Sequence, residues 1–557
     1  MLSIHPQYLN LAQLLSGRLF RVPEYQRAFS WTSKQRSELF EDILKTYNKG
    51  SDIEHFMAAV VVLRKDKVRI GTDVYHYMDI VDGQQRLTTL ILLLKAIEKG
   101  LDHSDQSQKK NAIELAELLV KPDSNSLLLL QTNQDTSHYF ATYLREGTHP
   151  EPVAAKTIAD RELLSAMVDC ESFVDKWKAL PVTLPDLIAL LKNRLAFILH
   201  EVQDEGTVYT VFEVLNSRGL VVPWLDRLKS ILMGSAFELK IGNKAHVIEE
   251  LHHIWRDIYV CVGLRQGMNS EALRFAATLK TQDCPNKPLA EEDAVEVLRG
   301  QARTAKEIVQ VAKWVLTVTQ AFDKIRGNRR LNAVTRISQA RLLATAINLR
   351  QDLTESQKSQ LLKRWEIVTF RIYGMLYKDA RTRVGDYVRL AWRVARENLE
   401  YKKVLTALTE IGSEYPIEDA IDELRETDCY NDWQEELRYF FFRYEEHLAR
   451  EQGLNFSNEQ WERIWEASAA DSIEHIWPQS KALLSQCHRL GNLILLPPQL
   501  NSKLSDKAPS EKRDAYMKTG LLIAQRVAQK LSKPWKKPAI TKRENELLAW
   551  AHNEWAD

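Results

Sequence analysis

Three observations predict an α+β fold that is mostly helical. The run Phe56–Leu63 is apolar and rich in β-branched residues, as expected of a buried strand. Residues 235–430 have apolar residues at helical spacing and few glycines, and no long segment among them has the pattern of a strand. Near the carboxyl end, Leu493–Leu496 reads as a strand that Pro497 and Pro498 end. We therefore expect a small α/β region first, then helices, then a helical domain that contains a short hairpin.

The amino-terminal elements can be taken in order. Leu9–Leu15 has the spacing of a short amphipathic helix, and Val74–Val81 alternates enough to be the second strand of the sheet. Ala196–Val202 reads as a strand that returns to this sheet. Helical spacing between these strands is found in Asn111–Val120, Leu163–Trp177 and Leu184–Leu191.

The later elements are predicted to be helical. Residues 431–470 form amphipathic helices whose aromatic residues we interpret as core rather than as a stacking platform. Ile540–Trp555 is a closing helix. The predicted domains are 1–235, a helical connector at 236–430, and 431–557.

Composition limits the class of protein. The 557 residues suffice for roughly three or four domains, and 76 basic residues nearly balance 75 acidic ones. No apolar run approaches the ~18 residues of a membrane span, and the first residues do not resemble a signal peptide. The five cysteines show no pairing or zinc pattern. These observations predict a cytoplasmic protein with reduced thiols and no membrane partner.

Charge is distributed unevenly along the chain. Residues 301–400 contain 20 basic and 9 acidic residues, and residues 401–480 contain 7 basic and 19 acidic ones. Such neighbouring blocks fit two helical segments that pack together, and they fit equally a phosphate-binding face. The candidate DNA-binding residues are Arg326, Arg329, Arg330 and, in the carboxyl-terminal segment, Lys503.

A strand, a glycine turn and a helix start meet at Asp82–Arg86. Free backbone N–H groups at a helix start favour an anion, and Arg86 could bind phosphate with its guanidinium fork. Gly83 supplies the turn, Gln84 and Gln85 supply amides, and Asp82 could bind Mg²⁺ or orient a water molecule. Taken alone, Asp-Gly-Gln is usually no more than a helix entry.

The segment from Ser472 to Asp506 combines the groups that a one-metal phosphodiesterase needs. Glu474 can hold a hard divalent cation through oxygen, and Asn501 offers a second oxygen ligand. His475 points to the other side of the same strand and can take a proton from water as a neutral imidazole. Asn492 can hold the histidine or its loop in place. Asp506 is a reserve ligand.

This segment resembles the HNH (ββα-metal) nucleases. Glu474-His475-Ile476 with Pro478 is similar to that family's Asp-His-Ile-x-Pro, and Asn492-Leu493 to its middle Asn-Leu. The resemblance is strongest to the HNH domain that ends GmrSD-type restriction enzymes. It differs in having Glu rather than Asp before the histidine, and in having Pro497 and Leu500 where many HNH proteins carry zinc cysteines.

Three further blocks resemble the ParB/sulfiredoxin-like amino-terminal domain of GmrSD-type proteins. They are Val22-Pro-x-Tyr-Gln-Arg-x-Phe-x-Trp31, Ile80–Leu90, and Tyr209–Leu220 followed by Leu225–Ser230. The resemblance implies nucleotide binding and hydrolysis at Asp82–Arg86. Further residues implied near that pocket are Tyr25, Arg27, Asn216, Arg218, Asp226 and Lys229.

The function implied by both resemblances is an NTP-regulated, metal-dependent DNA endonuclease that defends a prokaryote against phage or other foreign DNA. We expect Mg²⁺ or a similar ion, one of GTP, ATP or CTP, and DNA, including modified phage DNA, as substrate. A homodimer is a further expectation. Two alternatives stay open: a nucleotide-dependent DNA-binding regulator with a degenerate HNH centre, and a toxin-like nuclease that acts on RNA.

Overall fold

The computed structural model describes residues 5–23, 26, 28–48, 54–122, 127–132, 137–202, 223–239, 244–456 and 458–557. The chain divides into two compact units. The first holds Met1–Leu273 and Glu291–Leu316, and the second holds Arg274–Ala290 and Thr317–Asp557. The division falls within two helices, α11 (Met268–Thr278) and α13 (Ala305–Arg326), so the predicted connector contributes to both units. None of the described helices is long and apolar enough to cross a membrane.

A mixed six-stranded sheet organises the first unit. Its strands are β1 (His5–Asn10), β2 (Arg18–Arg21), β3 (His55–Ile70), β4 (Asp73–Asp82), β5 (Leu130–Gln131) and β6 (Leu195–Val202). They lie in the order β1-β6-β3-β4-β2-β5. The β1–β6 and β3–β4 pairs are antiparallel, whereas β6–β3, β4–β2 and β2–β5 are parallel. The predicted strands at 56–63, 74–81 and 196–202 are therefore confirmed.

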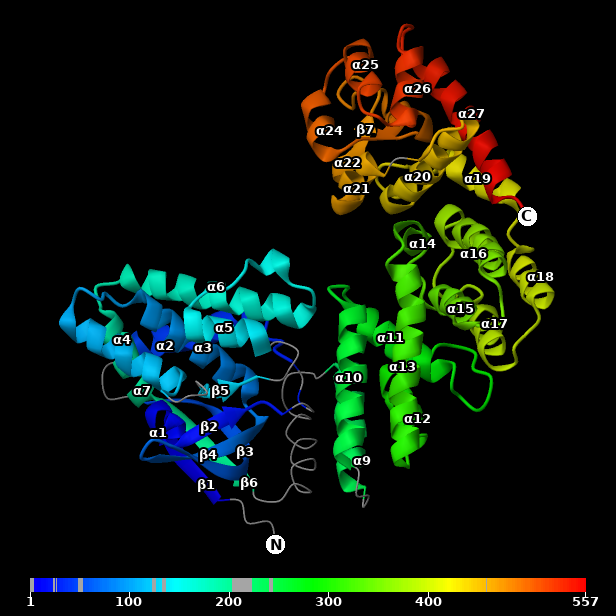
Figure 1. Cartoon of the computed structure of the whole chain (residues 1–557). Helices are drawn as coiled ribbons and strands as arrows, with labels where there is room; N and C mark the ends of the chain where they lie inside the picture. Colours follow the sequence, from blue (N-terminus) through cyan, green and yellow to red (C-terminus); the bar gives the residue numbers. More distant parts are fainter. Residues whose placement is uncertain are drawn as a thin grey trace. The chain divides into compact units, whose positions relative to one another are not determined.

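Helices cover this sheet, and α3, α5 and α6 lie on one side of it (Figure 1). The helices of the first unit are α1 (Leu11–Leu15), α2 (Ser33–Asn48), α3 (Gln84–Gly100), α4 (Gln106–Leu119), α5 (Ser137–Glu146), η1 (Pro152–Ala154), α6 (Ile158–Lys178), α7 (Leu184–Arg194), α9 (Trp224–Glu238), α10 (Lys244–Val262) and α12 (Glu291–Gly300). Almost every residue of α3 from Leu87 to Ile97 is buried, so this helix is the centre of the core.

The prediction for the first residues was wrong in part. Leu9 belongs to β1, and the helix begins only at Leu11. Asn10 marks the boundary because its side chain accepts a hydrogen bond from the Gln13 N–H, while the Gln13 side chain accepts one from the Asn10 N–H. This reciprocal capping box starts the helix. The preceding residues pair with β6 instead.

In its described residues, the second unit is helical apart from one short hairpin. Its remaining elements are α14 (Arg329–Ala333), α15 (Ser338–Leu349), α16 (Glu355–Thr369), η2 (Phe370–Met375), α17 (Val384–Arg396), α18 (Tyr401–Gly412), α19 (Ile417–Glu426), α20 (Gln434–Glu451), α21 (Glu459–Glu466), α22 (Ala469–Ser472), β7 (Ile473–His475), α23 (Leu484–Cys487), η3 (Leu490–Asn492), β8 (Leu493–Leu495), α24 (Pro498–Leu504), α25 (Pro509–Met517), α26 (Leu522–Lys530) and α27 (Lys537–Trp555).

The aromatic residues of α20 lie in the core, as expected. Tyr439, Phe440 and Phe441 are fully buried, and the Phe440 ring stacks on Trp555 of α27 at a centroid distance of 5.4 Å. Buried aromatic pairs of this kind stabilise a core beyond the area that they bury. The closing helix is thereby attached to the body of the unit.

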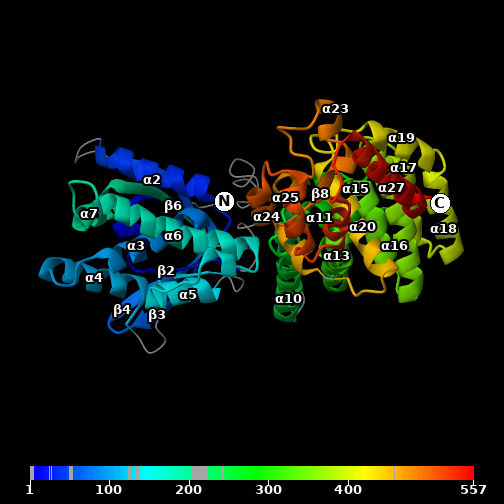
Figure 2. The same ribbon diagram turned by 90° about the horizontal axis from the view of Figure 1, so that it is seen from above.

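The carboxyl-terminal hairpin is antiparallel, with Glu474 opposite Ile494 and His475 opposite Leu493. Helices α24 and α25 follow it and lie beside it (Figures 1 and 2). In the sequence, the polar run Asn501–Asp506 is expected to lead into a helix. This expectation needs correction, because the helix does not begin after Asn501. It begins at Pro498, whose fixed backbone angle suits the first turn of a helix. Asn501 therefore lies inside α24.

Candidate functional site

His475 is buried on one face of the hairpin. Its side chain packs against the rings of Tyr430 and His488, at centroid distances of 4.6 and 5.4 Å. The Gln479 Nε2 atom lies 3.3 Å from the His475 Nε2 atom and 3.4 Å from Nδ1. Burial, with the nearby His488 and Lys512, lowers the pKa of His475 to about 3. The imidazole is therefore neutral at physiological pH, the state that a general base requires.

Asn492 fixes the loop that follows His475. Its Oδ1 atom accepts the Trp477 N–H at 2.9 Å, and its Nδ2 atom donates to the carbonyl groups of Trp477 and Cys487 at 3.0 and 2.9 Å. The Asn492 side chain is completely buried. Asn492 therefore holds main-chain groups of this loop rather than the imidazole itself.

Glu474 points to the opposite face of the hairpin, as alternation along a strand requires. Its Oε1 atom accepts a hydrogen bond from the Tyr516 hydroxyl at 2.7 Å and lies 2.8 Å from the Lys512 ammonium. Lys512 also donates to the His475 carbonyl at 2.7 Å. Burial raises the pKa of Glu474, and Lys512 and Tyr516 partly offset this effect. A cation at this carboxylate would have to compete with the ammonium of Lys512.

Asn501 joins α24 to the strand that carries Glu474. Its Nδ2 atom donates to the main-chain carbonyls of Asp471 and Ile473, at 2.9 and 3.1 Å. This contact places the Asn501 side chain next to the start of β7. Asp506, the reserve ligand, accepts a hydrogen bond from the Ser480 hydroxyl, so it is tied to the loop after His475.

A cleft of about 790 Å³ lies beside α24. Its cationic lining consists of Arg463, Lys503 and Lys518, and Glu466 is the acidic residue among its lining side chains. Pro497, Pro498 and Leu500 supply apolar walls. A hollow lined by three cationic side chains suits a phosphate backbone. Among the sequence candidates for DNA contact, Lys503 therefore has the most favourable surroundings.

The three candidate arginines near α14 differ in their surroundings. Arg330 makes two hydrogen bonds of 2.8 Å with the buried carboxylate of Glu366. Burial opposes ionisation of Glu366, but the guanidinium groups of Arg330 and Arg443 keep the pKa of this carboxyl below its usual range. A phosphate would have to displace this pairing, so Arg330 is better explained as a structural residue.

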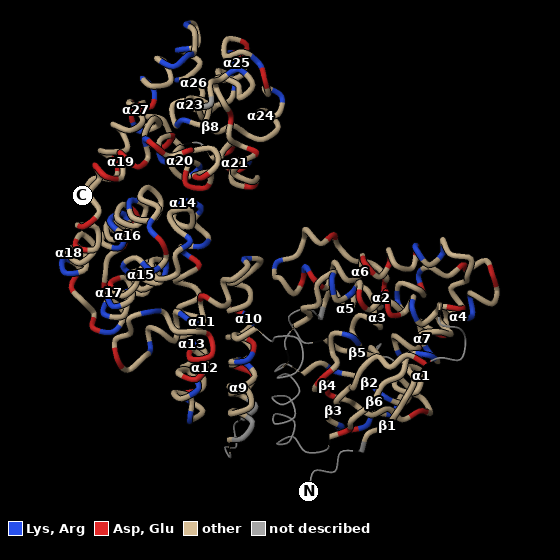
Figure 3. The backbone as a smooth tube through the Cα atoms, turned by 180° about the vertical axis from the view of Figure 1, so that it is seen from behind, with Lys and Arg blue, Asp and Glu red and all other residues tan. Residues whose placement is uncertain are grey.

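The other two arginines also contact protein groups. Arg326 donates to the Asn332 side chain at 3.0 Å, and the exposed Arg329 lies 3.6 Å from Glu466. Figure 3 shows basic residues on α14 and acidic ones along α20 and α21. The opposite charge blocks noted in the sequence are thus partly used within the second unit.

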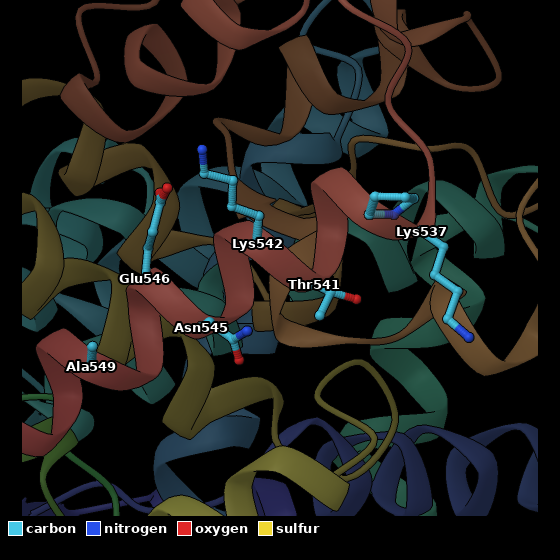
Figure 4. A pocket seen from close by; sticks show the side chains of 7 residues that line it. Lys537, Thr541, Lys542, Asn545, Glu546 and Ala549 are labelled. Atoms are coloured by element: carbon cyan, nitrogen blue, oxygen red, sulfur yellow. The ribbon is translucent and has the colours of Figure 1, made fainter.

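A second hollow, of about 760 Å³, lies along α27. The Lys537 and Lys542 side chains leave the helix in different directions (Figure 4). Glu546, which also lines this hollow, lies 2.5 Å from the Lys530 ammonium. The mixed charge and the diverging lysines make this hollow a poor phosphate site.

In the first unit, Asp82 ends β4 and Gly83 makes the turn into α3. Gly83 has φ of 93°, which favours glycine. A Cβ atom there would lie 3.2 Å from Val60 Cγ2 and 3.4 Å from the Ala59 carbonyl. The backbone of the turn therefore passes close to β3, and the Asp-Gly pair holds the helix start against the sheet.

Gln85 and Arg86 contact the segment that precedes α2. The Gln85 Oε1 atom accepts the N–H groups of Ser30 and Trp31 at 2.7 and 3.2 Å, and its Nε2 atom donates to the Ala28 carbonyl at 3.2 Å. The Arg86 guanidinium lies over the Trp31 ring, 5.5 Å from its centroid. Burial lowers the pKa of Arg86, and Asp82 partly offsets this effect. Gln85 is thus a structural residue, whereas Arg86 places a positive charge near Asp82.

Helix α9 reaches the same region. The buried Lys229 ammonium lies 3.5 Å from the Gln26 carbonyl, and the Gln26 side chain donates to the Val81 carbonyl at 2.8 Å. Asp226 accepts a hydrogen bond from the Tyr259 hydroxyl at 2.5 Å. Lys229 therefore reaches Gln26, whose side chain contacts the residue before Asp82. Tyr25, Arg27, Asn216 and Arg218 lie outside the described residues.

Sequence reasoning missed several residues of the carboxyl-terminal site. Lys512 and Tyr516 are four residues apart on α25, and this spacing places both on one helix face. That spacing was the available signal, but nothing local connected it with Glu474. Tyr430, Cys487 and His488 gave no comparable pattern, because they meet His475 only through the fold.

Comparison with known families gives two matches. Residues 11–233 match the family model described as the amino-terminal domain of GmrSD restriction endonuclease. Residues 416–550 match the one described as the carboxyl-terminal domain of GmrSD restriction endonucleases. No match was found among curated proteins.

The two matches define the class of protein as a restriction nuclease. The chain belongs to the GmrSD restriction endonuclease family. The resemblance seen in the sequence is thereby confirmed, and a restriction endonuclease acts on DNA.

Proposed function

We propose that this chain is a DNA endonuclease of the HNH type, regulated by a nucleotide and active against modified foreign DNA. The observation that carries the proposal is the neutral, buried His475 on a β-hairpin whose following loop is held by Asn492. A strand, a polar loop, a second strand and a helix occur in the order that the ββα motif requires.

His475 is proposed as the general base. A neutral imidazole can accept a proton from the water that attacks the phosphodiester. Gln479 lies within 3.4 Å of the ring and would help to set its orientation. Asn492 acts on main-chain groups, and we therefore assign it a positioning role rather than a direct part in proton transfer.

Glu474 and Asn501 are the proposed ligands of a divalent cation. Carboxylate and amide oxygens are the ligands that Mg²⁺ and similar hard ions prefer, so the donor types fit such an ion. The Lys512 ammonium at 2.8 Å holds positive charge at this carboxylate, and it would have to shift when a cation binds. A bound ion would stabilise charge on the phosphate.

A nucleotide is proposed to bind at Asp82–Arg86. The support is the close turn at Gly83, the Arg86 guanidinium beside Asp82, and the approach of Lys229 from α9. Positive groups at a helix start attract phosphate. Gln85 would act indirectly, because its amide holds residues 28–31.

The test pairs two substitutions in a cleavage assay on modified and plain DNA, with Mg²⁺ and each NTP. His475→Ala should abolish cutting while NTP hydrolysis continues. Asp82→Ala should abolish NTP hydrolysis, or its stimulation of cutting, while the folded protein still binds DNA. Cutting at the normal rate by His475→Ala would refute the assignment of the base.

The alternatives give different results in the same assay. A DNA-binding regulator with a degenerate centre would bind DNA but show no cleavage by the wild type with Mg²⁺, Mn²⁺ or Ni²⁺. A nuclease that acts on RNA would cut RNA in preference to either DNA.

A further inference from the structure

His475 also belongs to a second group of metal-ligand side chains, together with Cys487 and His488. The ligand atoms of His475, Cys487 and His488 all lie within 4.8 Å of one another. Tetrahedral zinc has bonds of about 2.0–2.3 Å, which places its ligand atoms roughly 3.3–3.8 Å apart. Small side-chain rotations would therefore close the three groups around one ion. Imidazole and thiolate ligands suit zinc and related transition metals rather than Mg²⁺.

The backbone that carries these ligands is held in place. Asn492 donates to the Cys487 carbonyl at 2.9 Å, and the His488 carbonyl accepts the Cys429 N–H at 3.2 Å. His475 lies on β7 within the hairpin. Cys487 and His475 are only 2% and 7% exposed. The ligands of a metal ion are thus already close together and shielded from bulk water.

Asp428 provides the second contact that histidine ligands commonly have. Its Oδ1 atom lies 3.3 Å from the His488 Nδ1 atom. A carboxylate at Nδ1 orients the ring and leaves Nε2 as the ligating atom. The negative charge of Asp428 also favours a dication nearby.

The two faces of the hairpin therefore differ in their chemistry. Glu474, whose carboxylate oxygens are the proposed ligands of a hard cation, faces Lys512 and Tyr516 of α25. His475 faces His488 and Tyr430. The hard-ion ligands and the imidazole–thiol group thus lie on opposite sides of one strand, and each can be tested separately.

We propose that His475, Cys487 and His488 bind one Zn²⁺ ion, or a similar thiophilic transition-metal ion, and that this ion switches the nuclease centre off. Binding releases the Cys487 thiol proton to solvent and forms bonds from one thiolate and two imidazoles. The imidazole lone pair of His475 then belongs to the metal and can no longer accept a proton from water. The inhibitory consequence rests on the proposed function of His475, whereas the binding site does not.

Binding is tested first, on the full-length chain without DNA. Calorimetric titration with Zn²⁺ in excess Mg²⁺ should show one tight site per chain. Cys487→Ser and His488→Ala should each weaken this site by 100-fold or more, and Asp428→Asn by about 10- to 100-fold. The exposed Cys284 provides the control, because Cys284→Ser should leave the titration unchanged.

Co²⁺ gives a readout that is independent of affinity. The wild type should show a thiolate-to-cobalt absorption band that Cys487→Ser lacks and Cys284→Ser keeps. The binding site is refuted if no tight Zn²⁺ is taken up, or if Cys487→Ser and His488→Ala bind Zn²⁺ as the wild type does.

Inhibition is tested second, in the Mg²⁺-supported cleavage assay, with each variant compared with its own rate without zinc. One equivalent of Zn²⁺ should inhibit the wild type, and Cys487→Ser should need at least 100-fold more. Tight binding without inhibition would refute the proposed inhibition, but the proposed zinc-binding site would still stand. If the wild type cuts no nucleic acid at all, the proposed function fails while the titration still decides the site.

Discussion

Asn492 and Trp477 hold each other through two hydrogen bonds that run in opposite directions. The Trp477 N–H donates to Asn492 Oδ1 at 2.9 Å, and Asn492 Nδ2 donates to the Trp477 carbonyl at 3.0 Å. Trp477 lies beyond the end of the strand. There the Asn492 side-chain amide takes the place that a main-chain partner on the opposite strand would have. The loop after His475 takes its shape from this pair.

Replacing Asn492 by Ala should destabilise the second unit. The change removes both bonds to Trp477 and the bond to the Cys487 carbonyl, in a side chain that is fully buried. Unpaired buried polar groups cost about 1–3 kcal/mol each, so we expect a loss of ~3 kcal/mol or more in urea unfolding. The control is the exposed Asn545, for which Asn545→Ala should change stability by only about 0.5 kcal/mol. Equal effects of the two substitutions would contradict the role of Asn492.

His475 should make stability depend on pH. Its pKa is about 3 in the folded chain and about 6.5 in an unfolded one, so the unfolded state binds the proton more readily. The stability contributed by this neutral histidine is complete above about pH 6.5 and is lost as pH falls towards 3, by up to about 1.4 kcal/mol per pH unit. His475→Gln lacks this titration. Urea unfolding at several pH values between 7 and 4 should therefore show a steeper decline for the wild type, and parallel curves would contradict the prediction.

Lys512 should contribute most of its stabilising effect only while Glu474 carries a charge. Lys512→Met leaves a buried carboxylate without its ammonium partner, and breaking a buried pair in this way costs about 3–5 kcal/mol. The double variant Lys512→Met with Glu474→Gln has no unpaired charge and should recover much of that stability. Thermal unfolding of the single and double variants measures the coupling. Additive losses would show that the two groups do not interact.

Substitutions of Lys503 in the basic cleft and of the partly exposed Arg330 should have different effects on DNA binding and on stability. Lys503→Ala removes a cleft lysine, and the slope of log affinity for DNA against log salt should become shallower by about 1. Arg330→Ala removes one of the two arginine partners of buried Glu366, and it should lower stability with little change in that slope. Lys542→Ala, in the hollow along α27, is the control for a lysine outside the cleft. DNA binding at several salt concentrations, with a melting curve for each variant, separates the three.

Much of the fold was predictable because it depends on local patterns. The apolar run at 56–63 and the alternation at 74–81 predict β3 and β4 from side-chain hydrophobicity alone. Helical spacing likewise predicts the described elements between 236 and 430. The errors at Leu9 and after Asn501 arose where one capping residue or one proline decides a boundary.

The sequence by itself determined the family, because the blocks that match it, including the one around His475 and Asn492, are set by spacing along the chain. Alternation on one strand also determined that Glu474 and His475 face opposite sides. Only the tertiary structure decided what each side chain meets. Lys512 reaches Glu474 from α25, and Cys487 and His488 approach His475 across the hairpin loop. The physical reason is that charge pairing, burial and ligand distances depend on separation in space, which no local pattern specifies.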